Sequence, residues 1–208
     1  MIDARDALAR LRDGNRRFVA NRSSADPANQ ARRTELVAGQ EPFAIILGCS
    51  DSRVPAELVF DQGFGDLFVI RIAGNIVAPS QIGSVEFAAA RFGTRLVVVL
   101  GHSQCGAVTA TLDELLGRAT TESKNLRSIV DRVRPAVEAV LEGPHSDDEP
   151  ALIRESVLAN VRASVDQLRH GSELLERLIE TDGLLVVGAK YSLETGVVTF
   201  LADEERGR

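Results

Sequence analysis

Residues 43–53 read FAIILGCSDSR, an apolar run that ends in a glycine and a short polar motif. Three more short runs, at 67–72, 96–100 and 184–187, are also rich in valine, isoleucine, leucine and phenylalanine. Continuous apolar runs are typical of strands buried on both faces, as in a parallel sheet covered by helices. The sequence therefore predicts an α/β fold around a central parallel sheet.

Helical patterns alternate with these runs, as in other α/β proteins. Helices are predicted at 3–20, 30–38, 55–60, 80–91, 107–116, 123–141 and 151–181. Polar connectors are predicted at 21–29 and 143–150. Helices therefore separate the successive strands, which is the spacing that parallel strands need.

The order of the strands decides which loops meet. For the parallel strands we predict the order 2-1-3-4, which makes the first and third strands neighbours. Their carboxyl ends, after residues 47 and 100, then meet at one crevice, where parallel sheets bind ligands. The segment 197–201 follows a Glu194-Thr195-Gly196 turn and is predicted to form an antiparallel edge strand with 184–191.

The chain has 208 residues, of which 44% are hydrophobic, and this suits a single domain spanning 1–208. Residues 1–40 are predicted to form an N-terminal helical arm, which packs either on a partner subunit or on the chain's own core. The net charge of -6 argues against nucleic acid and anionic membranes as the main partners. No apolar stretch approaches the roughly 20 residues that span a bilayer, and the N-terminus lacks an apolar secretory core. We therefore expect a cytoplasmic protein.

The only two cysteines, Cys49 and Cys105, stand in short polar motifs that follow apolar runs. The second motif reads His102-Ser103-Gln104-Cys105. In a reducing compartment, two cysteines are more often metal ligands or buried thiols than a disulfide. Two thiolates and one imidazole are ligands that zinc accepts, with the fourth position left to water or to Asp51.

Arg53 bears on that choice, because its guanidinium can hold the Asp51 carboxylate through two hydrogen bonds and keep it off the metal. Taken alone, each motif is weak. A cysteine after a strand is usually a core residue, and an Asp–Arg pair is usually a surface ion pair worth about 0–1 kcal/mol. Together, at two matched strand ends, the motifs indicate a catalytic metal site.

Cys49-Ser50-Asp51-Ser52-Arg53-Val54, with His102-x-x-Cys105-Gly106, resembles the signature pair of the bacterial, zinc-dependent β-class carbonic anhydrases. The similarity continues through 66–71, 73–75 and 83–87, and covers about residues 35–110. The resemblance implies a lyase that hydrates carbon dioxide reversibly to bicarbonate and a proton by attack of zinc-bound hydroxide. It also implies one Zn2+ per chain and a homodimer or homotetramer in which the N-terminal helices grip a second subunit.

The resemblance assigns roles to individual residues. It implies that Cys49, His102 and Cys105 are the zinc ligands. Asp51 and Arg53 match the gating dyad, and Asp51 binds the metal only in a closed form. The implied substrate-binding residues are Gln40, acting across the dimer cleft, Phe68, Ala73 and Phe87 in an apolar pocket, and Gly106 through its backbone amide.

Some members of the family are closed by bicarbonate that binds in a separate pocket containing a tryptophan. This chain has no tryptophan, and Ile46 stands where that residue is expected. We therefore predict the open form at neutral pH, with a closed form still possible at acid pH.

Two other functions remain open. A related hydrolase could use the same zinc on carbon disulfide or carbonyl sulfide, and a metal-binding or regulatory module could have lost its activity. The intact set of five motif residues argues against the second alternative.

Overall fold

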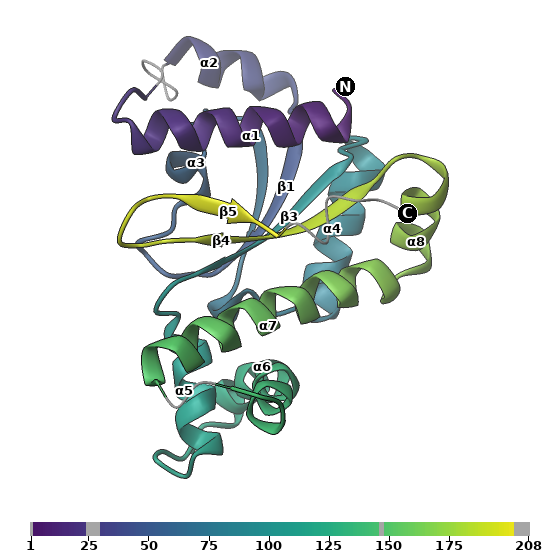
Figure 1. Cartoon of the computed structure of the whole chain (residues 1–208). Helices are drawn as coiled ribbons and strands as arrows, with labels where there is room; N and C mark the ends of the chain where they lie inside the picture. Colours follow the sequence, from purple (N-terminus) through teal and green to yellow (C-terminus); the bar gives the residue numbers. More distant parts are fainter. Residues whose placement is uncertain (1, 24–29, 146–147, 202–208) are drawn as a thin grey trace.

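A five-stranded sheet with the order β2-β1-β3-β4-β5 runs through the centre of the computed structural model (Figure 1). The structure describes residues 2–23, 30–145 and 148–201, so parts of both predicted polar connectors lie outside the described residues. The strands are β1 (Ala44–Gly48), β2 (Leu67–Arg71), β3 (Leu96–His102), β4 (Leu185–Tyr191) and β5 (Val198–Phe200). The first four pair in parallel, and β5 pairs antiparallel with β4. The predicted fold class and strand order are confirmed.

Helices cover both faces of this sheet (Figure 1). They are α1 (Ala4–Val19), α2 (Gln30–Glu35), α3 (Ala56–Val59), α4 (Pro79–Arg91), α5 (Gly106–Leu115), α6 (Lys124–Glu142), α7 (Glu149–His170) and α8 (Glu173–Thr181), with 3₁₀ turns η1 (Leu36–Ala38) and η2 (Ala73–Asn75). Side chains of β1 alternate between two cores. Ile46 packs with α1 and α3, whereas Ile45 and Leu47 pack with α4 and α7. Every residue of β1 and β3 is therefore buried, which explains the continuous apolar runs.

The single helix predicted at 151–181 is wrong, because the structure has two helices, α7 and α8, in its place. The break falls at Gly171 and Ser172. Gly171 caps the end of α7, and the hydroxyl of Ser172 accepts a hydrogen bond from the amide of Leu175 at the start of α8. Serine is favoured at this capping position because its hydroxyl satisfies an amide that has no partner within the helix.

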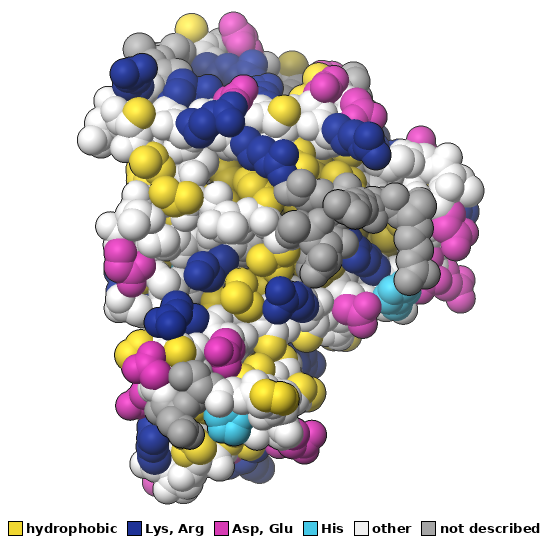
Figure 2. Space-filling model, in the orientation of Figure 1, with side chains coloured by type: hydrophobic (Ala, Val, Ile, Leu, Met, Phe, Trp, Pro, Cys, Tyr) yellow, Lys and Arg dark blue, Asp and Glu magenta, His cyan; other side chains and the backbone are white. Residues whose placement is uncertain are grey.

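The N-terminal helix α1 packs on the chain's own sheet. Its apolar face buries Ala4, Ala7, Leu8 and Leu11 in the same core as Ile46. Figure 2 shows basic side chains gathered over this helix, whose outer face is rich in arginine. By contrast, α2 has no buried residue. Within the predicted arm, α1 is therefore part of the domain core. That α2 packs on a partner subunit stays a prediction.

A buried asparagine joins α1 to the end of α3 and to the segment that forms β5. The Asn15 side-chain amide donates to the carbonyl oxygens of Val59 (3.0 Å) and Gly196 (2.9 Å). Its side-chain oxygen accepts a hydrogen bond from the amide of Val198 at 2.9 Å. One side chain thus joins the first helix to the loop before β5 and to β5 itself.

Gly14 lets α1 approach the end of α3 closely. A Cβ atom at this position would lie 1.8 Å from the carbonyl oxygen of Phe60. We expect Gly14→Ala to lower the free energy of unfolding by about 1–3 kcal/mol, since the helix must move away from the core. The measurement is urea unfolding, with Arg5→Ala on the exposed face of α1 as the matched control. Equal stability of Gly14→Ala and wild type would contradict the close packing.

No helix among the described residues is both long and apolar enough to cross a bilayer.

Candidate metal centre

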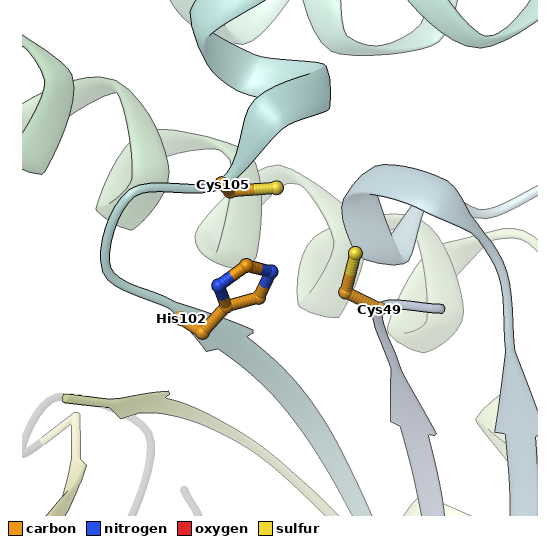
Figure 3. A group of neighbouring side chains, drawn as sticks. All are labelled: Cys49, His102 and Cys105. Atoms are coloured by element: carbon orange, nitrogen blue, oxygen red, sulfur yellow. The ribbon is translucent and has the colours of Figure 1, made fainter. Parts of the chain in front are cut away.

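Two neighbouring strands and one helix bring the three predicted ligands together. Cys49 follows β1 directly, and His102 is the last residue of β3. These strands pair in parallel with Gly48 opposite Leu100, so their carboxyl ends lie at the same edge of the sheet. Cys105 precedes the first residue of α5. Figure 3 shows the three side chains pointing toward one another across the gap between β1, β3 and α5.

The donor set fits a tetrahedral zinc ion. The ligand atoms of Cys49, His102 and Cys105 lie within 4.8 Å of one another, and all three residues are buried. The Nδ1 atom of His102 lies 2.8 Å from the carbonyl oxygen of Ser103, so it carries the proton. The Nε2 atom is then a bare acceptor, and it has no hydrogen-bond partner among the described residues although it is fully buried. A buried acceptor that faces two thiols is what a metal site requires.

The surroundings of the two sulfur atoms favour one thiolate even without a metal. The Cys105 thiol beside Cys49 lowers the pKa of Cys49 to about 4 by hydrogen bonding, and the Gly74 amide, 3.4 Å from the sulfur, acts in the same direction. The same pairing raises the pKa of Cys105. Burial lowers the pKa of His102, but the Cys49 sulfur and the Ser103 carbonyl raise it, and the net shift is upward. The centre therefore offers a thiolate to a divalent cation even before the metal binds.

The metal-free protein is expected to keep the Cys49 thiolate at a pH well below the ordinary pKa of a cysteine thiol. Because this pKa is lower in the folded chain than in the unfolded one, the thiolate stabilises the fold fully above the unfolded pKa. That contribution is lost as the pH falls through the folded pKa. Ultraviolet absorbance of the thiolate, followed against pH in chelator, measures the titration. Cys105→Ala should move it to higher pH, and an unchanged titration in that variant would contradict the pairing.

Asp51 stands beside the centre and is held by Arg53. The Arg53 Nε atom donates to Oδ1 of Asp51 at 2.9 Å, and a terminal nitrogen of the same guanidinium donates to Oδ2 at 2.8 Å. These hydrogen bonds hold the pKa of Asp51 well below its usual range. Oδ2 lies 3.9 Å from Nε2 of His102, so the carboxylate borders the point where the three ligands converge.

Arg71 fixes the backbone of the first motif. It donates to the carbonyl oxygens of Cys49 (3.1 Å) and Asp51 (2.6 Å). The backbone of Cys49 and Asp51 is thereby fixed to the end of β2.

The residues predicted to bind substrate fall into two groups. Ala73 and Gly106 lie next to the centre: Ala73 precedes Gly74, and Gly106 begins α5 directly after Cys105. Gln40 is exposed and precedes β1, so the whole strand separates it from Cys49 within one chain.

Phe68 and Phe87 lie in an aromatic cluster with Phe92. The ring centroids of Phe68 are 6.2 Å from those of Phe87 and 6.0 Å from those of Phe92. Phe92 also lines a cavity together with Gln40. The three rings and Gln40 therefore lie near the edge of the sheet that is formed by β2.

Sequence reasoning assigned no role to Gly74, although its amide faces the Cys49 sulfur. Gly74 has a φ of 70°, and a Cβ there would lie 3.1 Å from that of Ala107. Its carbonyl oxygen accepts a hydrogen bond from Asn160 on α7 at 2.8 Å. The available signal was a glycine shortly after the apolar run at 67–72, where a backbone amide can approach another group closely.

The fold and the site together define an α/β protein with a buried cysteine- and histidine-lined centre, able to hold a metal ion, at the carboxyl edge of its parallel strands. Residues 44–198 match the sequence profile of the carbonic anhydrase family. Carbonic anhydrase 2 of Mycobacterium tuberculosis is 39% identical over 186 residues, which cover 89% of this chain and 87% of that protein. A carbonic anhydrase of Mycolicibacterium smegmatis is 38% identical over 188 residues, with 90% and 88% covered.

Solved structures agree with this assignment. The β-carbonic anhydrase CafA of Aspergillus fumigatus superposes with a TM-score of 0.72 at 27% identity, covering 95% of this chain and 90% of that one. A tetrameric β-carbonic anhydrase of Sordaria macrospora gives 0.74 at 22% identity, with 95% and 98% covered, and supports the fold alone. The chain belongs to the β-carbonic anhydrase family of lyases.

Proposed function

We propose that this chain catalyses the reversible hydration of carbon dioxide to bicarbonate and a proton, with one Zn2+ per chain held by Cys49, His102 and Cys105. The observation that carries the proposal is the buried Nε2 atom of His102, which faces two thiols and has no other partner among the described residues. Membership of the carbonic anhydrase family supports carbon dioxide as the substrate.

A zinc ion held by these three ligands would supply Lewis-acid activation of a water molecule. The carboxylate of Asp51 borders the point where the ligands converge and is ionised at neutral pH, so it would accept a hydrogen bond from this water. A water that donates to Asp51 turns a lone pair toward the substrate. Arg53 occupies both carboxylate oxygens and thereby keeps Asp51 in the accepting position and off the metal.

Substrate binding is assigned to residues of two subunits. Phe87 is 55% exposed and Gln40 is exposed, and both lie on the side of the edge strand β2. A second copy of the chain packed on this side would cover the exposed ring of Phe87. It would also bring Gln40 toward the metal centre of the other copy, since β1 separates Gln40 from the centre of its own chain. Phe68 and Ala73 would line the apolar pocket for carbon dioxide, and the Gly106 amide would face the developing oxyanion. We therefore propose a homodimer or homotetramer.

The cytoplasm is the proposed compartment. Both cysteines are free thiols and both are buried in the centre. Thiols in this state persist in a reducing environment.

The proposal is tested by stopped-flow measurement of carbon dioxide hydration before and after treatment with a chelator. Hydration should need one zinc per chain by elemental analysis, disappear with the metal and return when zinc is added back. The same preparations are assayed against carbon disulfide and carbonyl sulfide. A zinc-loaded chain that hydrates carbon dioxide no faster than buffer would contradict the proposal, and activity on the sulfur compounds alone would replace the substrate.

A further inference from the structure

The two residues between the ligands His102 and Cys105 are held from outside by one carboxylate. Glu194 lies in the turn between β4 and β5. Its Oε2 atom accepts a hydrogen bond from the hydroxyl of Ser103 at 2.8 Å, and its Oε1 atom accepts one from the side-chain amide of Gln104 at 2.7 Å. The turn is thus hydrogen-bonded to both residues of the loop that connects the two predicted metal ligands.

The directions of these hydrogen bonds require an acceptor at Glu194. The Ser103 hydroxyl already accepts a hydrogen bond from the amide of Leu193 at 2.9 Å, so its single proton is left for Glu194. Ser192 is in the same position: its hydroxyl accepts from the amide of Thr195 at 3.1 Å and donates to Oε2 of Glu194 at 2.9 Å. Two hydroxyls and one amide therefore converge on a group that can only accept, and an ionised carboxylate is such a group.

The charge of this carboxylate is secure at physiological pH. The backbone amide of Glu194 itself, followed by the hydroxyls of Ser103 and Ser192 and the amide of Gln104, lowers the pKa of Glu194 to about 2.

Ser103 transmits this anchoring to the metal ligand. Its carbonyl oxygen lies 2.8 Å from the Nδ1 atom of His102, and this contact leaves Nε2 free for the metal. Its amide donates to the carbonyl oxygen of Tyr191 at 2.9 Å. Ser103 is therefore fixed through its amide, its carbonyl and its hydroxyl, and Glu194 is the acceptor for the proton of that hydroxyl.

Gln104 gives Glu194 a second hold on the loop. Its φ angle is 55°, in the left-handed region that residues other than glycine adopt at a cost. This backbone conformation turns the chain so that Cys105 stands directly before α5 and still faces Cys49. The hydrogen bond from the Gln104 side chain to Glu194 holds that conformation in place.

We propose that Glu194 is a positioning residue for the metal centre, which sets the orientation of the His102 ring and the path of the loop to Cys105. It touches neither metal nor substrate, and it acts through Ser103 and Gln104. The inference rests on the proposed function, because it assumes that the centre binds zinc.

The test compares Glu194→Gln with Glu180→Gln, an identical chemical change at an exposed residue of α8, at the other end of β4. Zinc affinity is measured by competition with a chromophoric chelator, and ligand geometry by the visible absorption of the Co2+-substituted protein. Glu194→Gln should bind zinc roughly tenfold more weakly or worse, as loss of an outer hydrogen-bond partner does, and should shift the cobalt spectrum. Glu194→Asp, which keeps both acceptor oxygens, should recover part of the affinity. Glu180→Gln should behave as wild type.

A double variant separates positioning from a general loss of stability. If Glu194 acts through Ser103, Ser103→Ala alone should weaken zinc binding, and Ser103→Ala with Glu194→Gln should lose less than the two single losses combined. Wild type that binds no zinc would overturn the proposed function. If wild type binds zinc and Glu194→Gln has the same zinc affinity and the same cobalt spectrum, only the role of Glu194 is overturned.

Discussion

Replacing Cys49 by serine is expected to remove both bound zinc and carbon dioxide hydration. A serine hydroxyl does not ionise near neutral pH, so the centre loses one of its two thiolates while the fold keeps a side chain of similar size. Loss of an outer-shell partner already costs roughly 10–100-fold in metal affinity or activity, and loss of a ligand should cost more. The measurements are zinc content after dialysis and stopped-flow hydration at neutral pH.

Reconstitution supplies the control. Chelator-treated wild type should regain its rate when zinc is added, whereas Cys49→Ser should not. Ser50→Ala, at the exposed position next to Cys49, should keep its zinc. A Cys49→Ser protein that retained one tightly bound zinc and the wild-type rate would remove Cys49 from the centre.

Arg53→Ala is expected to leave zinc in place and still nearly abolish turnover. Without the guanidinium, Asp51 can swing to the open metal position and exclude water. A loss of about a hundredfold corresponds to a closed form in about 99% of molecules. Hydration rate and zinc content, measured on the same preparation, separate this outcome from metal loss.

The pH dependence of this variant has a definite direction. Loss of Arg53 lets the pKa of Asp51 rise toward its ordinary value of about 3.9, so the carboxylate stays ionised at neutral pH and the loss of rate is not due to its protonation. Raising the pH ionises the competing water, which should then displace Asp51 more readily, so the defect should shrink at alkaline pH. The control is Arg95→Ala. Arg95 directly precedes β3 and pairs with Asp182 much as Arg53 pairs with Asp51, so its loss should not change the rate. A wild-type rate in Arg53→Ala would show that Arg53 does not control Asp51.

The sequence was most informative where local pattern and topology agree. Runs such as that at 43–47 predicted doubly buried strands, and the strand order then brought Cys49 and His102 to one edge, as the register of β1 and β3 confirms. The break at Gly171 was missed because helical spacing of apolar residues continues across it, and only the cap formed by Ser172 shows that a new helix begins.

Other features could not be read from the sequence because they join distant segments. Glu194 was identified only as part of a turn, and its contact with Ser103 spans 91 positions. The proposed place of Gln40 at the metal centre of a second subunit would depend on how two chains pack. Local patterns carry no information about such contacts, which are set by the docking of complete elements.

The hydrogen bonds of Asn15 affect how the chain matures during synthesis. The first helix leaves the ribosome early, yet the amide of Val198 that it binds lies 183 positions later. Until that strand is made, the apolar face with Leu8 and Leu11 has only a partial docking site, and closing so long a loop slows folding. A chain that ends before residue 198 would therefore hold the first helix less firmly against the sheet, because Asn15 would lack one of its three backbone partners.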